Sequence, residues 1–176
     1  GNAILSRFAI LKSDNHDVSN SRLERRGLLH CEMDYAGSAH RLHCICVHLS
    51  LTAASRRRQM ATLVERIEAL VPADAPLIIA GDFNDWHNRA DNLLAERLAL
   101  TEVFCGTQGQ CARSFPSTLP VFRLDRIYVR GFSVRAAEVH YGPPWSRISD
   151  HAALSAEVFP VPAAAPRARD LQAAHA

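Results

Sequence analysis

The spacing of hydrophobic residues along the chain predicts a succession of strands before one long helix. Residues 1–11, 27–35 and 41–51 have the composition of strands, with a polar loop at 12–26 and a turn at 36–38. The last of these strands is largely apolar on both faces, which is typical of a central strand in a sheet.

The clearest helix is predicted at residues 55–71, where hydrophobic residues recur at helical spacing. Ser55 is a suitable N-cap, and Pro72 marks the end of the helix. The arginines at 56–58 favour a solvated face at the helix start, with contact to a phosphate group as the alternative.

Shorter elements follow in the second half of the chain. The pattern predicts a buried strand at 77–80, a short helix at 92–98, an irregular loop at 106–120 and closing strands at 124–129, 133–139 and 152–159. Residues 160–176 are rich in Ala, Pro and Arg and are expected to form a disordered tail. We therefore expect one domain over residues 1–159.

Composition limits the class of protein without identifying its partner. The 176 residues suffice for one domain with a single core. The formal charge of +2 permits a phosphorylated substrate but is weaker than the basic bias usual for nucleic-acid-binding proteins. No run reaches the roughly 18 apolar residues that a membrane span requires.

The five cysteines show no regular spacing, which argues against a disulfide framework and favours a reducing compartment. We therefore expect a cytoplasmic protein. Cys44 and Cys46 lie close to His43 and His48, which suggests zinc as an alternative. In a strand, however, the two cysteines share one face as small hydrophobic residues, and this interpretation is favoured.

Polar residues gather where the predicted strands begin or end. They are His48, Asp82 with Asn84, Asp125, and Asp150 with His151. Loops held by rigid strands are the usual location of catalytic groups. Gly81-Asp82-Phe83-Asn84 alone is equally consistent with an ordinary turn, but the joint occurrence of all four clusters favours a functional site.

Asp125 requires a partner because it shares a strand face with Ile127 and Val129. A carboxylate in apolar surroundings is costly unless it is paired or hydrogen-bonded. Arg126 points to the opposite face, so we expect His151 to be the partner. A histidine held by a carboxylate has a fixed tautomer and a favoured cationic form, which can stabilise a phosphoryl oxygen or transfer a proton.

The order of these motifs resembles that of the endonuclease/exonuclease/phosphatase superfamily. The matching segments are Gly1-Asn2-Ala3-Ile4-Leu5-Ser6-Arg7, Arg26-Gly27-Leu28-Leu29, His48-Leu49, Gly81-Asp82-Phe83-Asn84, Leu124-Asp125-Arg126-Ile127 and Ser149-Asp150-His151. The resemblance implies an α+β fold, the four-layer α/β sandwich of deoxyribonuclease I, in which two packed mixed β-sheets are flanked by helices.

The resemblance also implies roles for individual residues. Asp82 would orient or deprotonate the attacking water, and Asn84 would hold that water and a phosphoryl oxygen. His151, steadied by Asp125, would stabilise the developing charge, while His48 would face the scissile phosphate near the leaving group.

The implied cofactor is Mg²⁺ or Mn²⁺, because the available ligands are hard oxygens. Asp150 resembles a metal ligand or the partner of one. Arg26 and Asn2 would line the site and contact the substrate.

One feature of the family is missing from the chain. Family members begin with a strand that carries an Asn and a second strand that ends in Gln-Glu, whose Glu is a principal metal ligand. Glu24 and Glu32 lie in other contexts. We therefore expect an N-terminally incomplete domain that binds metal weakly and associates through an open sheet edge, and a longer, monomeric and active parent.

The leading hypothesis is a metal-dependent phosphoester hydrolase that acts by in-line attack of water, on a phosphodiester rather than a monoester. The substrate would be nucleic acid, a phospholipid head group or a small phosphoester. The alternatives are a catalytically incomplete fragment, or an interaction module of the same fold, and a zinc-binding module.

Overall fold

The computed structural model describes residues 1–22, 24–35, 40–86 and 90–161. Its strands are β1 (Ile10–Asp17), β2 (Gly27–Met33), β3 (Leu42–His48), β4 (Leu77–Asp82), β5 (Thr101–Glu102), β6 (Asp125–Arg130), β7 (Phe132–His140) and β8 (Ala153–Pro160). Its helices are α1 (Ala53–Leu70), α2 (Ala90–Leu98), α3 (Val103–Gln108) and the short 3₁₀ turn η1 (Trp145–Arg147).

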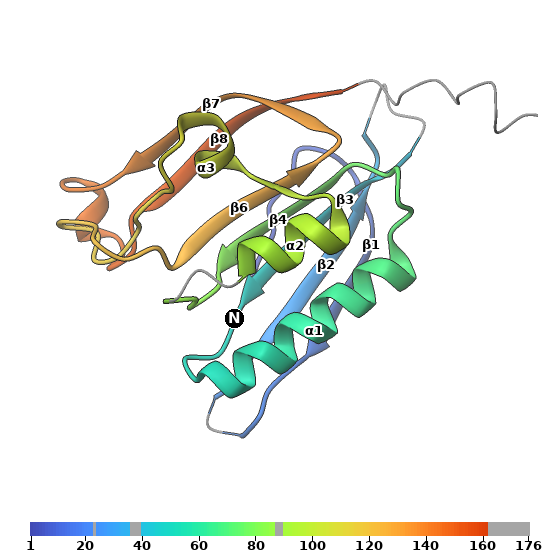
Figure 1. Cartoon of the computed structure of the whole chain (residues 1–176), viewed down its shortest axis with the longest axis horizontal. Helices are drawn as coiled ribbons and strands as arrows, with labels where there is room; N and C mark the ends of the chain where they lie inside the picture. Colours follow the sequence, from blue (N-terminus) through green and yellow to red (C-terminus); the bar gives the residue numbers. More distant parts are fainter. Residues whose placement is uncertain (23, 36–39, 87–89, 162–176) are drawn as a thin grey trace, which may run out of the picture.

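Six strands form the main sheet in the order β1-β2-β3-β4-β6-β5, and β7 pairs with β8 in a separate two-stranded sheet. Within the main sheet only β3 and β4 are parallel. A parallel pair needs a long crossover connection, and α1 supplies it. Figure 1 shows α1 running along the main sheet, with the β7–β8 hairpin beyond β6.

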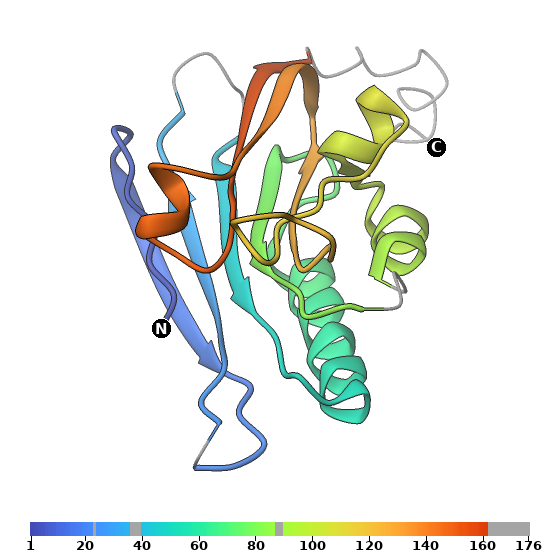
Figure 2. The ribbon, with the colours of Figure 1, turned by 90° about the vertical axis from the view of Figure 1, so that its left-hand side faces the viewer.

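The main sheet is covered on both faces, so its two faces pack against different elements. The face toward α1 and α2 carries the larger core, which includes Val47, Leu63, Ile79, Leu94 and Tyr128. The opposite face packs around α3 and the β7–β8 hairpin through residues such as Phe104, Val129, Val139 and Leu154. Figure 2 shows α1 and α2 on the same side of the sheet.

The structure confirms the predicted strands in the middle and closing parts of the chain, and differs in three places. The strand predicted at 1–11 lies instead at Ile10–Asp17, mostly within the loop predicted at 12–26. It is an edge strand with exposed side chains, so it lacks the alternation that marks a half-buried strand. A six-residue helix, α3, overlaps the predicted loop at 106–120 and is too short to show helical periodicity.

The third difference is the helix start, because Thr52 rather than Ser55 is the N-cap of α1. Arg56 is also buried, not solvated: its guanidinium donates hydrogen bonds to the carbonyl oxygens of Ser50 and Leu51, each at 3.1 Å. The turn predicted at 36–38 and the tail from 162 onward lie outside the described residues.

The cysteine prediction is wrong for two of the five residues, because Cys105 and Cys111 form a disulfide. Cys31, Cys44 and Cys46 are free, and burial raises the pKa of the Cys44 thiol to about 12. Cysteine usage therefore no longer supports a reducing compartment, and cytoplasmic location stays a prediction. Across the described residues, no helix combines the length and apolar character needed to cross a bilayer.

Two histidines, His43 buried and His30 half-buried, lie together on the α1 side of the sheet. His30 Nε2 lies 2.9 Å from His43 Nδ1, on adjacent strands. Burial, and then the neighbouring His43, lower the pKa of His30 to about 4 from 6.5. Burial likewise lowers the pKa of His43. Both imidazoles are therefore held neutral in the folded protein.

This pair predicts that the fold loses stability on mild acidification. Between about pH 6.5 and pH 4, His30 is protonated in the unfolded chain but stays neutral in the folded protein. The free energy of unfolding therefore falls as the pH decreases. Urea unfolding at about pH 7 and about pH 5 measures the loss, and His30→Gln is expected to reduce it. An unchanged pH slope in the variant would contradict the assignment to His30.

Candidate active site

Three polar side chains form a row across neighbouring strands of the main sheet. His48 at the end of β3 is in register with Asp82 at the end of β4, which is in register with Asp125 at the start of β6. Adjacent strands are about 4.8 Å apart, and residues in register point to the same face. Because Val47 and Tyr128 belong to the core under α1, the row projects from the opposite face.

His151 joins the row from the loop before β8. Its Nδ1 lies 2.6 Å from Asp125 Oδ2, which is the pairing predicted from the sequence. Burial alone would lower the pKa of His151, but the hydrogen bond and the charge of Asp125, together with Asp82 and Asp150, outweigh it and raise the pKa. The contact therefore fixes the ring and favours its cationic form.

Asp82 and His48 shift in the directions expected for a partly buried acid and base. Burial raises the pKa of Asp82, the nearby Asp125 adds to this, and the hydrogen bond from the Asn84 backbone opposes it. Burial, and then Arg26, lower the pKa of His48. His48 Nε2 lies 3.4 Å from Asp82 Oδ2, close enough for the charges of the two groups to affect each other.

The turn after β4 holds Asp82 in place. The Asn84 backbone N–H donates to Asp82 Oδ1 at 2.8 Å, and the Asn84 side-chain amide donates to Asp82 Oδ2 at 3.0 Å and to the Leu49 carbonyl at 2.9 Å. Asn84 has φ 48°, an unfavourable backbone conformation that Asn tolerates better than most residues. Gly81 is required because a Cβ there would collide with the Val47 carbonyl oxygen.

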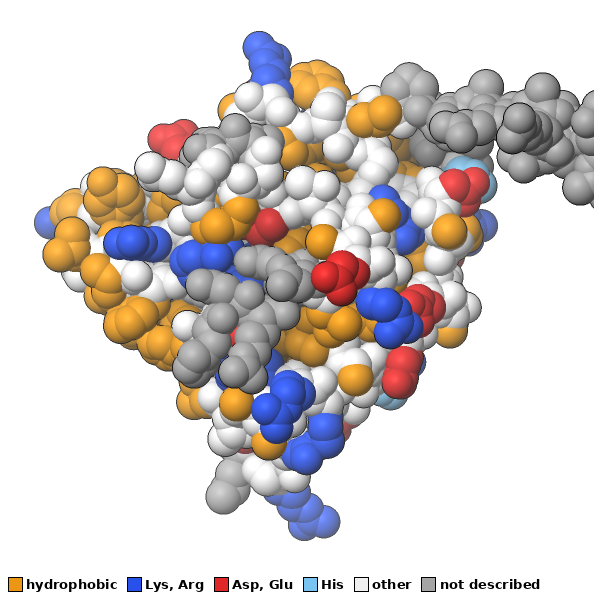
Figure 3. Space-filling model, in the orientation of Figure 1, with side chains coloured by type: hydrophobic (Ala, Val, Ile, Leu, Met, Phe, Trp, Pro, Cys, Tyr) orange, Lys and Arg blue, Asp and Glu red, His pale blue; other side chains and the backbone are white. Residues whose placement is uncertain are grey.

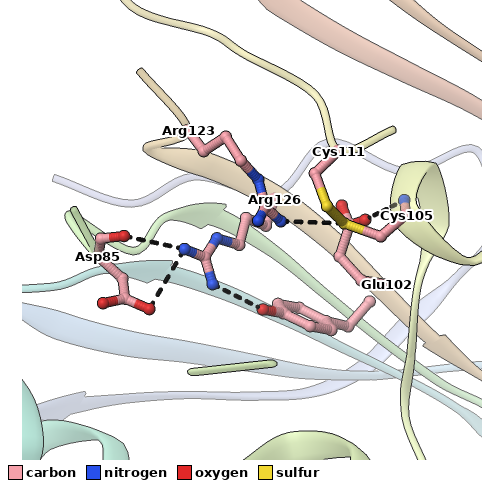
Figure 4. The surroundings of a disulfide bond; sticks show 7 residues. Asp85, Glu102, Cys105, Cys111, Arg123 and Arg126 are labelled. Carbon is pink, nitrogen blue, oxygen red and sulfur yellow. Dashed lines mark hydrogen bonds and ion pairs between the residues drawn. A yellow bond between two sulfur atoms is a disulfide. The ribbon is translucent and has the colours of Figure 1, made fainter. Parts of the chain in front are cut away.

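A buried ion pair ties this turn to β6 from the other side of the sheet. Arg126 Nη2 lies 3.0 Å from the Asp85 carbonyl oxygen and 3.2 Å from Asp85 Oδ2, and Arg126 Nη1 donates to the Tyr128 hydroxyl at 3.1 Å. Figure 4 shows the Arg126 side chain extended toward Asp85. Because Arg126 follows Asp125, one strand holds both the turn and the histidine.

A loop segment holds the other half of the site. Ser114 is fully buried; its Oγ accepts from the Asp125 backbone N–H at 3.0 Å, and its carbonyl accepts from the Ala152 N–H at 2.7 Å. Ser117 donates from its N–H to the Asp150 carbonyl at 2.7 Å and from its Oγ to the Ser149 carbonyl at 2.6 Å. The two serines therefore fix the loop that carries Asp150 and His151.

The row of His48, Asp82 and Asp125, together with His151, lines a cleft of about 610 Å³. It contains all but one of the residues predicted from the sequence: Arg26, His48, Asp82, Asn84, Asp125, Asp150 and His151. The exception is Asn2, whose amide donates to the carbonyl oxygens of Gly27 at 2.6 Å and Cys46 at 2.9 Å. Asn2 therefore anchors the N-terminal segment to the strands.

Three carboxylates and one arginine are found among the described residues that line the cleft. Asp82, Asp125 and Asp150 lie on its wall, and Arg26, whose guanidinium is 3.1 Å from Glu24, is the only Lys or Arg among the described lining residues. The only described trio of His, Cys, Asp or Glu with ligand atoms within 4.8 Å of one another lies elsewhere, at Glu102, Cys105 and Cys111. A zinc site at Cys44 and Cys46 therefore receives no support.

Basic side chains do not form one continuous stripe on the face shown in Figure 3. Lys and Arg side chains are interspersed there with acidic and hydrophobic ones. The exposed arginines Arg57 and Arg58 lie at the start of α1. This distribution agrees with the modest net charge of +2.

Comparison with known proteins identifies the family of this fold and site. The Endonuclease/Exonuclease/phosphatase family profile matches residues 1–151, which include the whole cleft. The chain belongs to this family. A relative from Escherichia coli (strain K12), the protein YbhP, is 42% identical over 158 residues. That alignment covers 90% of this chain and 62% of YbhP, so the chain spans less than two thirds of its relative's length.

Solved structures with similar folds include D. rerio TDP2 complexed with single-strand DNA product, with a TM-score of 0.68 and 21% identity. That match covers 87% of this chain and 69% of TDP2. The mannosyl-6-phosphatase Bt3783 of Bacteroides thetaiotaomicron has a TM-score of 0.67 and 15% identity, covering 86% of this chain and 67% of the other. At these identities the likeness establishes the deoxyribonuclease I-like fold expected from the sequence.

Several residues of this family site were not predicted from the sequence. Leu51, Trp86, Phe115 and Leu124 form an apolar part of the cleft wall. The sequence gives a weak signal for two of them: Trp86 closely follows the Gly-Asp-Phe-Asn motif, and Leu124 is the first residue of the Leu-Asp-Arg-Ile segment. The supporting serines and the Asp85–Arg126 pair act through contacts between distant segments, for which no local pattern exists.

The buried ion pair predicts a large effect on stability. Arg126→Met removes the nearer of two arginines beside buried Asp85, the other being Arg56 with its Nε 4.0 Å from Asp85 Oδ1, and is expected to lower the free energy of unfolding by about 3 kcal/mol. The double variant Asp85→Leu/Arg126→Met removes both charges and is expected to recover part of that loss. Urea denaturation measures both.

The matched control is an exposed ion pair. Arg135 and Glu157 are 67% and 51% exposed, so Arg135→Met is expected to cost less than about 1 kcal/mol. An Arg126→Met loss as small as that of the control would contradict the anchoring role.

Proposed function

We propose that the site is that of a metal-dependent phosphoester hydrolase, in which an activated water attacks phosphorus in line with the leaving group. The observation that carries this proposal is the row of His48, Asp82 and Asp125 across three paired strands, completed by the Asp125–His151 contact at 2.6 Å. It directs the Asp82 carboxylate, the His48 imidazole and the fixed cationic His151 into one cleft. Family membership supports the general activity.

In this proposal Asp82 accepts a proton from the attacking water. Its raised pKa makes it a stronger base than an ordinary aspartate, and Asn84 keeps its carboxylate oriented. His151, kept cationic by Asp125, stabilises negative charge on a phosphoryl oxygen. His48, with a lowered pKa, lies beside Asp82 and faces the leaving-group side.

The cleft suits a hard divalent cation in part. It offers carboxylate oxygens of Asp82 and Asp150. Among the described lining residues one arginine faces three acidic side chains, so a bound cation would reduce the repulsion between the carboxylates. Asp150 would hold Mg²⁺ or Mn²⁺ together with water and phosphate oxygens, because these residues alone do not fill an octahedral shell. Such an ion would supply Lewis-acid stabilisation of the phosphoryl group.

We propose a phosphodiester as the substrate, in preference to a monoester. The structural neighbour solved with single-strand DNA product is consistent with this, whereas the neighbour named a mannosyl-6-phosphatase shows that the fold also carries sugar-phosphate chemistry. Among the described lining residues Arg26 is the one arginine, which suits a diester, with one negative charge per phosphate, better than a doubly charged monoester.

The competing proposal is that these residues form an incomplete site or a non-catalytic module. It is favoured by one observation: the alignment covers only 62% of YbhP, so other parts of such a protein would contribute to the site. Under this proposal the chain folds and presents the cleft but turns over no substrate. A monomeric, cooperative unfolding transition without hydrolysis would support it.

Hydrolysis of bis(p-nitrophenyl) phosphate with Mg²⁺ tests the proposed function, with p-nitrophenyl phosphate as the monoester comparison. We expect the diester to be the better substrate and EDTA to abolish turnover. His151→Ala is expected to reduce kcat by about a hundredfold or more, since it removes the fixed cation.

The matched control is His140→Ala. The His140 side chain is 24% exposed, against 25% for His151, but it belongs to β7 and does not line the cleft. Turnover that survives EDTA, or that falls equally in both variants, would contradict the proposed site.

A further inference from the structure

A line of aromatic rings leads from His151 to the surface at the mouth of the cleft. The ring centroid of Phe115 lies 5.0 Å from the His151 imidazole and 6.5 Å from Phe122, and Phe122 lies 4.9 Å from Trp86. The outer two rings are well exposed, Trp86 at 43% and Phe122 at 44%. Adjacent exposed apolar side chains at the edge of a polar site are a common feature of ligand-binding surfaces.

These rings are held by the same elements that hold the catalytic candidates. The backbone N–H of Trp86 donates to the Asn84 carbonyl at 3.2 Å, so Trp86 belongs to the turn that orients Asp82. Phe122 and Phe115 exchange backbone hydrogen bonds at 2.9 and 3.2 Å in an antiparallel bridge. The outer pair is T-shaped, with an interplanar angle of 63°.

The surroundings of the rings distinguish between possible ligands. Arg26 is the only Lys or Arg among the described residues that line the cleft, so the site provides charge for one phosphate rather than for a long polyanion. Rigid aromatic faces bind planar rings by stacking regardless of ring identity, and they give an aliphatic chain no such advantage. The geometry therefore suits a substrate that carries a planar group close to its scissile phosphate.

We propose that Trp86 and Phe122 form a stacking shelf for a planar aromatic substituent of the substrate, such as a nucleobase or an aryl group, next to the scissile phosphate. This inference rests on the proposed function, because it assumes that the phosphate binds between Asp82 and His151. It makes Trp86 and Phe122 specificity residues that contact the substrate without taking part in the chemistry.

Competition between two phosphate monoesters of similar size tests the shelf. Phenyl phosphate is planar at its ring, whereas cyclohexyl phosphate is equally apolar but not planar. As inhibitors of bis(p-nitrophenyl) phosphate hydrolysis, we expect phenyl phosphate to bind about tenfold more tightly. Trp86→Ala and Phe122→Ala are each expected to bring this ratio toward one, while Trp145→Ala, which removes a tryptophan 40% exposed outside the cleft, leaves it unchanged.

A direct readout separates the shelf from the proposed catalysis. The protein has two tryptophans, so in Trp145→Phe the fluorescence reports Trp86 alone. We expect phenyl phosphate to change this fluorescence at about tenfold lower concentration than cyclohexyl phosphate. That result without any hydrolysis would retain the shelf and reject the proposed function. Equal binding of the two esters, or a preference that survives Trp86→Ala, would overturn the shelf even in an active enzyme.

Discussion

The site depends on the strand register at one end of the main sheet. Pairing of β3 with β4 and of β4 with β6 places His48, Asp82 and Asp125 in a single row, although they are widely separated in the sequence. A slip of one residue in either pairing would turn one member to the opposite face, into the core under α1. The close approach of Gly81 to the Val47 carbonyl, which excludes any side chain at that position, locks the first pairing.

Buried polar contacts hold the segments that carry these side chains in fixed positions. On one side of the sheet Arg126 holds the turn that carries Asp82, through Asp85. On the other side Ser114 joins the backbone of Asp125 to the strand that follows His151. Such contacts contribute little net stability for the charges they bury, but breaking one leaves an unpaired group in the interior. They therefore specify position more than they stabilise the fold.

Much of this arrangement was predictable from the sequence, for identifiable reasons. Buried strands such as Leu77–Asp82 and the long helix have strong periodicity, and the apolar neighbours of Asp125 required a partner. The exposed edge strand β1 gave no alternation to detect, and the six-residue α3 gave no helical period. The Cys105–Cys111 disulfide, the aromatic wall and the role of Arg126 follow only from long-range packing.

The proposed function requires that Asp82 of β4 and His151 of the loop before β8 act together in one reaction at the same phosphate. A double-mutant cycle on the hydrolysis of bis(p-nitrophenyl) phosphate tests it most directly, with Asp82→Asn, His151→Ala and the combined variant. Residues that act as one unit are strongly non-additive, so we expect the combined variant to lose little more kcat than the more damaged single variant. Losses that multiply would show that the two groups act independently and would contradict the account.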